Sequence, residues 1–250
     1  DDAIPVVKLA ADQLQRYIRK ITGVRLRVET RSHSDVPVQV YVGRSRYTDK
    51  LGIRGDQFKH GGFRMVSGDE WLVLIGRDRA FRPPEPYLRS HSDMGRLMKE
   101  WDRLTGEKFG FPYSQIHKQH YAELDIWEKD ERGSFNAVCA FLRMEGVRWY
   151  LPDEEIGEVV PQKWRIPLPD IDKTVRPDFP VRYPYQLYRR FGHGTTGRDE
   201  VLWQLRMGFN QAPDVVGLGG MAHGLNAVHS RDEVKQAHPE YYALWGGRRE

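Results

Sequence analysis

The sequence has only one cysteine, Cys139, and no apolar run that approaches the roughly 18 to 20 residues needed to cross a bilayer. A single cysteine excludes an intramolecular disulfide, so cysteine content does not identify the compartment. Because Cys139 lies within an apolar helical pattern, we expect a buried, unreactive thiol there and not a nucleophile. The lack of a long apolar run predicts that the protein has no membrane partner.

Charge of one sign is not concentrated in a long run either. The 250 residues include 39 basic and 35 acidic ones, and the net charge of +4 is distributed along the chain. The basic stretch typical of many nucleic-acid-binding proteins is missing, so we predict no nucleic-acid partner. Residues 217–220, Gly-Leu-Gly-Gly, lack the lysine and the glycine spacing of a phosphate-binding loop, and no cofactor is expected.

The histidines are not spaced as metal ligands. His223, His229 and His238 are six and nine residues apart, which does not place them on one helix face. His117 and His120 are three residues apart, but their polar neighbours indicate a solvated surface. No HExxH or cysteine pattern accompanies any of them, and we predict no metal site.

The residues that are present are typical of a folded, water-soluble protein: 39% are apolar, 30% are charged and seven are tryptophans. Apolar residues recur at steps of three and four through residues 4–22, which predicts an amphipathic helix ending at Gly23. Residues 24–28 and 38–42 are expected to form strands, and residues 44–53 a short helical turn with a loop.

Two further strands are predicted at residues 62–66 and 71–75, joined by a tight turn that contains glycine. The second strand is apolar throughout, so we expect it to lie centrally in a sheet with both faces covered. Residues 156–161 and 164–167 contain prolines, which cannot donate to a strand ladder, and this predicts edge strands.

The clearest helix signal lies at residues 133–144. Asp130 and Glu131 precede it and would place negative charge at the positive end of the helix dipole. Its apolar stripe comprises Phe135, Ala137, Val138, Phe141 and Leu142. Gly146 is expected to cap the helix C-terminus, and residues 147–151 to form a short strand that ends at Pro152.

This region carries a resemblance to a known family. A Gly-small-aromatic-x-Ala-x-x-x-Phe-Leu helix followed by Gly-Val-Arg-Trp-Tyr-Leu-Pro, residues 133–152, is similar to the end of the small α/β domain that precedes the catalytic barrel in α-glucuronidases and hexosaminidases. It resembles still more closely a group of secreted bacterial glycoside-hydrolase-like proteins that carry a domain of unknown function. The resemblance covers nearly the whole chain and implies a carbohydrate substrate and a secreted or periplasmic location. The start at Asp1-Asp2, directly before a helix, fits a mature form without its leader.

Residues 79–129 depart from the resemblance, because in similar proteins the strand before them leads almost directly into the helix at residues 133–144. This insertion of about fifty residues is rich in Tyr, His, Trp, Arg and Lys. A loop of this length without a role is uncommon. Two interpretations stay open, a packing decoration at the sheet edge and a segment that contacts substrate.

We predict an α/β protein: an α+β sheet domain with helices packed on it, followed by the first βα units of a TIM-type barrel. Residues 1–174 would form the accessory domain, and residues 175–250 a proline-rich linker and two βα units of an incomplete (β/α)8 barrel. The expected barrel strands lie at residues 185–188 and 215–218. The expected helices after them lie at residues 199–207 and 231–237.

Loops after barrel strands build the active sites of such proteins, and His193 and His223 each follow a predicted barrel strand. Arg189 and Arg190 are candidates to pair bidentately with a uronate or sulfate group. We therefore predict that Arg189, Arg190, His193 and His223 bind substrate. The alternative is that the histidines bind loop carbonyls and the arginines pair with nearby acids.

The resemblance implies catalytic carboxylates on later barrel strands, downstream of residue 250, and the catalytic residues themselves stay unidentified. Asp153, Glu154 and Glu155 form the densest acidic cluster, which we interpret as a solvated turn. The first hypothesis is thus the N-terminal portion of a secreted glycoside hydrolase acting on a polysaccharide, inactive as residues 1–250 alone. The alternative is a non-catalytic carbohydrate-binding or scaffold module. The sequence leaves the oligomeric state open.

Overall fold

The computed structural model describes residues 3–32, 35–80, 96, 99–100, 103, 123–127, 130–179, 182, 197–209 and 231–249. Helices and strands are mixed in one core, so the expected α/β class is confirmed at this level. None of the helices in these ranges is long and apolar enough to cross a membrane.

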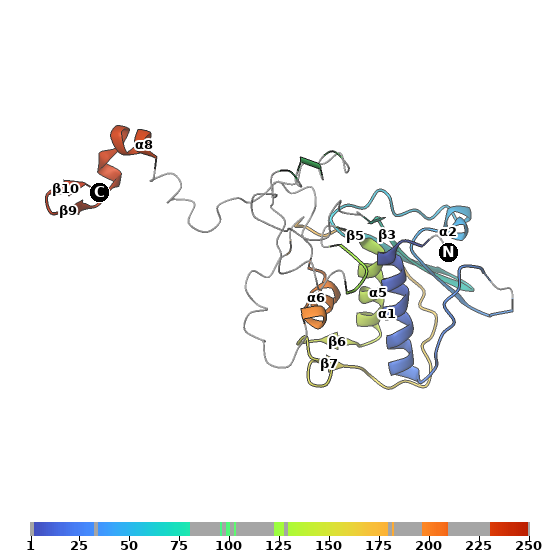
Figure 1. The fold of residues 1–250 in the computed structure, drawn as a ribbon. Coiled ribbons are helices and arrows are strands. Elements are labelled where there is room, and N and C mark those ends of the chain that lie inside the picture. Colours follow the sequence, from blue (N-terminus) through green and yellow to red (C-terminus); the bar gives the residue numbers. More distant parts are fainter. Residues whose placement is uncertain are drawn as a thin grey trace.

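Two helices lie side by side against one face of the sheet (Figure 1). Helix α1 (Pro5–Thr22) begins with proline, whose fixed φ suits the first helical position, and ends at Gly23 in the left-handed conformation with φ 78°. Helix α5 (Gly133–Met144) buries all five residues of the stripe that its sequence predicts. Both predicted helices are confirmed.

The main sheet has the strand order β1-β3-β2-β8. Strand β1 (Gln39–Val42) runs parallel to β3 (Trp71–Gly76), and the hairpin partner β2 (Phe63–Gly68) runs antiparallel to β3. Strand β3 is central and buried beyond its first residue, as predicted from its continuous apolar run. The predicted strands at residues 38–42, 62–66 and 71–75 are therefore confirmed.

Alternation along β3 divides the interior into two layers. Leu72 and Leu74 face α1 and α5, whereas Val73 and Ile75 face the other way and pack with Ile53. Ile53 follows α2 (Arg46–Lys50), the predicted helical turn, whose N-terminus is closed by a capping box between Ser45 and Thr48.

One predicted strand of the sheet was wrong, and one observed strand was not predicted. Residues 24–28 form no strand, and Val24 and Val28 are 57% and 53% exposed; only Leu26 packs against the core. The fourth strand is instead β8 (Asp172–Val175), which pairs antiparallel with β2. Its Asp-Lys-Thr-Val sequence carries no apolar alternation, because an edge strand buries little of its surface.

A second ladder lies beside the C-terminal end of α5, where β6 (Arg148–Trp149) pairs with β7 (Glu158–Val159). The strand predicted at residues 147–151 is thereby confirmed in its centre. Of the strand predicted at residues 156–161, only β7 forms. Residues 164–167, which were also predicted as a strand, form none.

The two ends of the insertion are held together by strands β4 (Asp78–Arg79) and β5 (Glu131–Arg132), in which Arg79 is paired with Glu131. Near its C-terminal end, Leu124 and Ile126 are buried in the main core. At least this part of the insertion thus has a packing role. Most of residues 79–129 lie outside the described part of the chain.

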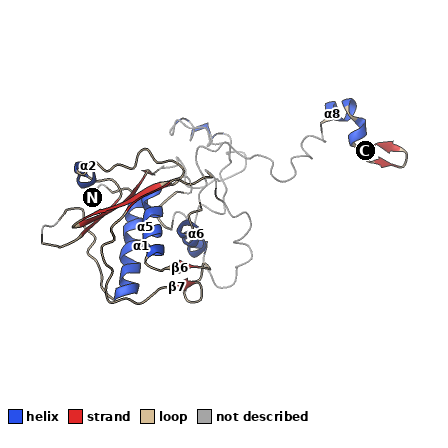
Figure 2. Cartoon of the chain, turned by 180° about the vertical axis from the view of Figure 1, so that it is seen from behind, coloured by secondary structure: helices blue, strands red, loops and turns tan. Residues whose placement is uncertain are grey.

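Helix α6 (Gly197–Arg206), predicted at residues 199–207, packs on α5, and Figures 1 and 2 show α5 between α1 and α6. Val201, Leu202 and Leu205 belong to the same core as the sheet domain. The helix that we expected to open a barrel is therefore seated on the accessory domain.

The last described range, residues 231–249, contains short elements only. They are α8 (Asp232–Ala237), the 3₁₀ helix η3 (Pro239–Tyr241), and a ladder of β9 (Leu244–Trp245) with β10 (Arg248–Arg249). The predicted helix at residues 231–237 is confirmed. The expected barrel strands at residues 185–188 and 215–218 fall outside the described residues, so the barrel and the boundary near residue 175 stay predictions.

Candidate functional site

The four residues predicted to bind substrate, Arg189, Arg190, His193 and His223, all lie outside the described part of the chain. Their proposed role therefore stays a prediction. Two polar clusters, each built from residues far apart in the sequence, and one surface groove lined by residues 12–29 stand out within the described ranges.

The first cluster is a buried network that joins α1, α6 and β7 around Arg206. The guanidinium of Arg206 donates from Nε and Nη2 to Oε1 of Gln13, at 3.1 and 2.8 Å. Its Nη1 lies 3.1 Å from Oε1 of Glu158. The side chains of Arg206 and Glu158 are only 4% and 3% exposed, so this is a buried ion pair whose donors and acceptors are satisfied.

Two aromatic side chains complete this network. The hydroxyl of Tyr17 donates to Glu158 and accepts a hydrogen bond of 2.7 Å from the indole N–H of Trp149. Burial raises the pKa of the Tyr17 phenol above its ordinary value, although the positive charge of Arg206 acts in the opposite direction. Tyr17 therefore keeps its proton and serves as a donor. The guanidinium of Arg206 also lies 5.2 Å from the centre of the Tyr17 ring.

Further cations surround the exposed side of the network. Lys20 Nζ lies 2.7 Å from the second carboxylate oxygen of Glu158 and 3.4 Å from Glu154. Glu154 also pairs with Arg16 and lies 3.7 Å from Arg206. Since both carboxylates are surrounded by cations, they lack the separate environments of a catalytic acid and base. We conclude that the network fixes α6 to the sheet domain.

The acidic cluster at residues 153–155 is a turn, as predicted. Oδ1 of Asp153 accepts hydrogen bonds from the backbone N–H groups of Glu155 and Ile156, at 2.7 and 3.1 Å. Glu154 points to the cations of α1, and no catalytic pair is formed by the three acids.

The members of the buried network were not predicted from the sequence. Gln13 interrupts the apolar stripe of α1 between Ala10 and Tyr17, and Arg206 lies one turn after Leu202 on the buried side of α6. A polar residue at an apolar position of the period is a signal of a buried partner. The spacing of residues along one helix does not indicate which residue elsewhere in the chain is that partner.

The second cluster lies at the neck of the insertion, where β4 meets the N-terminus of α5. The carboxylate of Asp78 accepts hydrogen bonds from the backbone N–H of Ser134, at 2.9 Å, and from its hydroxyl. The Ser134 hydroxyl in turn accepts from the backbone N–H of Gly76 at 3.0 Å. Since Arg132 at the N-cap provides no side-chain cap, Asp78 caps α5 from a distant strand.

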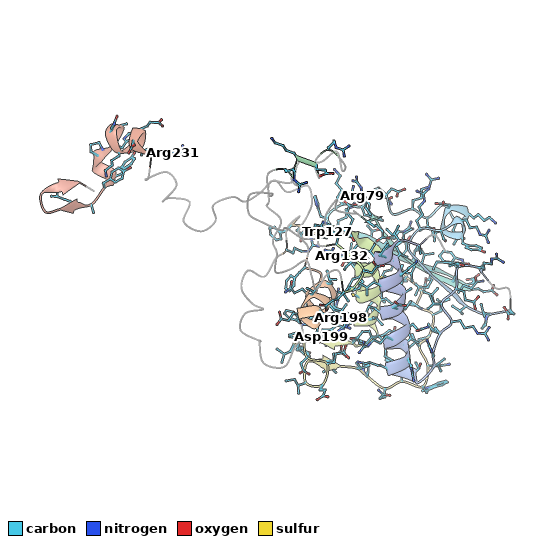
Figure 3. All side chains as sticks on the ribbon, viewed as in Figure 1. Arg79, Trp127, Arg132, Arg198, Asp199 and Arg231 are labelled. Carbon is cyan, nitrogen blue, oxygen red and sulfur yellow. The ribbon has the colours of Figure 1, made fainter. Side chains whose placement is uncertain are left out.

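Burial raises the pKa of Asp78 to about 7, against the lowering effect of its hydrogen bonds with Ser134. Nearby, Glu131 pairs with Arg77, and Arg132 donates to the backbone oxygen of Trp127 at 3.1 Å. Figure 3 places Trp127 and Arg132 at the upper end of α5, close to Arg79. The carboxyl group that contacts the first turn of α5 is thus that of Asp78, whereas Asp130 and Glu131, the two acids that the sequence suggested, accept from the backbone N–H of Trp127 and pair with Arg77, respectively.

The surface groove runs along α1. One hollow of about 470 Å³ is lined by Gln15, Arg16, Arg19, Lys20 and Arg25. A second hollow of about 480 Å³ shares Gln15 and Arg25 with it and is lined in addition by Asp12, Leu26, Arg27, Val28 and Glu29. We call the two adjoining hollows the α1 furrow. Gln15 holds its outer wall in place by donating to the backbone oxygen of Leu26 at 2.7 Å.

No group of three metal-ligating side chains occurs within the described ranges. His238 pairs with Glu240 at 3.0 Å and stacks on Tyr241, whereas His117, His120, His223 and His229 lie outside these ranges. Cys139 is buried, as predicted, and burial raises the pKa of its thiol to about 12.

Comparison with family models, with curated proteins and with solved structures returned no match for this chain. The resemblance to the accessory domains of α-glucuronidases and hexosaminidases therefore stays a prediction from the sequence motifs, and the geometry described above is the basis for a functional proposal.

Proposed function

We propose that this chain is the N-terminal portion of a glycoside hydrolase that acts on a polysaccharide bearing uronate or sulfate groups. In this proposal the sheet domain is an accessory module, and the segment after the proline-rich linker begins the catalytic barrel. General acid and base catalysis would use carboxylates downstream of residue 250. Arg189, Arg190, His193 and His223 would contact the substrate.

The observation that supports this proposal is the anchoring of α6. An accessory domain stiffens a barrel only if the first barrel helix is fixed to it. Four apolar side chains of α6 (Val201, Leu202, Trp203 and Leu205) enter the sheet-domain core, and Arg206 is bound to α1 and β7. In addition, the indole N–H of Trp203 lies 3.3 Å from the backbone oxygen of Trp149. These contacts are of the kind that joins two modules into one rigid unit.

The experiment compares two proteins, residues 1–250 and the product of the reading frame continued beyond codon 250. Each is incubated with polygalacturonate, sulfated polysaccharides and p-nitrophenyl glycosides, and reducing ends or nitrophenol are measured. We expect hydrolysis by the longer protein only. Turnover by residues 1–250 alone, or no hydrolysis by a longer protein with carboxylates at its strand ends, would contradict the proposal.

The alternative function is carbohydrate binding without catalysis. The exposed rings of Trp164 and Tyr150, which are 81% and 65% exposed, favour it, because flat apolar rings on a surface are available for contact with a ligand. Glycan binding by residues 1–250 that survives deletion of residues 80–129 would assign the binding to the sheet domain and not to the insertion.

A further inference from the structure

The α1 furrow has a surplus of positive charge. Arg16 and Lys20 pair with Glu154 and Glu158 at one end of the furrow. Arg19 and Arg25 also line it and are exposed, and neither forms an ion pair with another described residue. The guanidinium groups of Arg19, Arg25 and Arg27 thus remain for an anionic ligand, against two acids in the lining, Asp12 and Glu29. A guanidinium matches the geometry of a carboxylate or sulfate.

The shape of the furrow suits an extended ligand better than a single ion. Its two hollows share Gln15 and Arg25, so Arg25 stands between them and Arg27 continues the line of cations. Leu26 and Val28 provide apolar wall between these charges. A ligand chain that alternates negative groups with apolar patches would match this alternation of cations and apolar residues along the furrow.

The furrow is held open by the fold. The hydrogen bond from Gln15 to Leu26 fixes residues 24–28 beside α1 although they pair with no strand in the described part of the chain. Gly23, in the left-handed conformation, reverses the backbone between the helix and this wall. The binding surface is therefore largely preformed, which lowers the cost of ordering on binding.

From this arrangement we infer that the α1 furrow binds an acidic polysaccharide, with Arg19 and Arg25 pairing with its carboxylate or sulfate groups. The inference deepens the glycoside-hydrolase proposal and rests on it for the choice of a sugar chain. The described residues that line the furrow include no aromatic ring. Single-stranded nucleic acid, which uses aromatic stacking as well as charge, is therefore a poorer fit.

The test measures binding of residues 1–250 to an oligogalacturonate of six units by calorimetry at low and at moderate salt. A neutral oligosaccharide of equal length, a sulfated oligosaccharide and an oligothymidylate are the comparison ligands. We expect binding of the acidic sugars that weakens as salt is raised, no measurable binding of the neutral sugar, and weaker binding of the oligothymidylate.

The decisive variant is Arg19→Gln with Arg25→Gln, which should reduce affinity at least tenfold. The matched control is Arg54→Gln with Lys173→Gln, which removes the same charge at exposed positions outside the furrow and should change affinity less than twofold. Thermal unfolding of both variants checks that they are folded. An equal loss in the control would show that net charge alone attracts the ligand and would overturn the assignment.

Tighter binding of the oligothymidylate than of the acidic sugars would also overturn it, as would no binding of the unmodified protein to acidic sugars. Failure of the furrow proposal can be distinguished from failure of the glycoside-hydrolase proposal, because binding is measured without turnover. Hydrolysis by the longer protein without binding in the furrow would refute the furrow alone. Binding without hydrolysis would refute only the enzyme.

Discussion

Two nitrogens of the Arg206 guanidinium donate hydrogen bonds to the same side-chain oxygen of Gln13, although the two residues are 193 positions apart in the chain. This contact joins the end of α6 to the middle of α1. It makes the stability of the sheet domain depend on a residue beyond the proline-rich linker.

Replacing Arg206 with alanine should lower the free energy of unfolding by about 3 to 5 kcal/mol. The change removes the buried one of the two cations that contact the carboxylate of Glu158 and leaves Lys20, whose side chain is 34% exposed, as the other; removing one partner of a buried ion pair is costly. Urea denaturation followed by tryptophan fluorescence measures the loss. The control Arg198→Ala, on the same helix but 43% exposed, should cost less than about 0.5 kcal/mol. Equal effects of the two variants would contradict a special role for Arg206.

Replacing Tyr17 with phenylalanine tests the aromatic part of the network. The change keeps the ring but removes the hydroxyl that contacts both Glu158 and Trp149, and it should cost about 1 to 3 kcal/mol. Tyr150→Phe at an exposed ring is the matched control and should be nearly neutral. The same denaturation measurement applies, and a neutral Tyr17→Phe variant would show that water replaces the hydroxyl.

Asp78 should give the protein a particular pH dependence. Its pKa of about 7 in the folded protein lies above the value near 4 of an unfolded chain, so the folded state binds the additional proton. Asp78 therefore favours folding most below about pH 4, and this contribution is lost as pH rises towards 7. Replacing Asp78 with asparagine, which stays neutral, should remove the fall in the free energy of unfolding that the titration of Asp78 causes between about pH 4 and 7. The variant should gain stability relative to the unmodified protein between pH 4 and 8.

Urea midpoints measured at intervals across that range provide the comparison. Asp69→Asn, in the exposed turn between β2 and β3, is the control and should follow the unmodified protein at every pH. A constant difference between Asp78→Asn and the unmodified protein would mean that the carboxyl does not titrate in this window.

Replacing Gly133 with alanine should destabilise the protein by about 1 to 3 kcal/mol through overpacking. A Cβ at this position would lie 2.6 Å from the backbone nitrogen of Arg77 and 2.7 Å from Cα of Gly76. Gly23→Ala is the informative comparison, because a Cβ there has open space and only its positive φ opposes it, at a cost of about 1 to 2 kcal/mol. Structures of the variants should show a backbone shift at residues 76–77 for Gly133→Ala only.

Much of the described fold could be predicted because the buried faces of helices and strands require apolar residues at regular intervals in the sequence. The helices around Leu14 and Val138 and the continuous apolar strand at residues 71–75 were predicted for that reason. Strand β8 was missed because its outer position requires no apolar residues. Residues 24–28 have the alternation of a strand, but pairing needs a neighbour that no local pattern specifies.

The contacts that organise the candidate sites were beyond local prediction for the same reason. The local sequence does not single out Glu158, whose partners Tyr17 and Arg206 lie 141 positions before it and 48 positions after it. Nor does it single out Asp78, which caps a helix that begins more than fifty residues later. Hydrogen-bonding groups must be satisfied when buried, but the sequence does not say by which residue.

The pairing of Arg79 with Glu131 has a consequence for how this protein can change over evolutionary time. Because the chain leaves the sheet and returns to it at adjacent positions, the part of the intervening segment that precedes the core residues Leu124 and Ile126 can vary in length while β4 and β5 keep their pairing. Sequence changes between β4 and β5 can therefore alter what the protein binds, while the strands that flank the segment keep their positions.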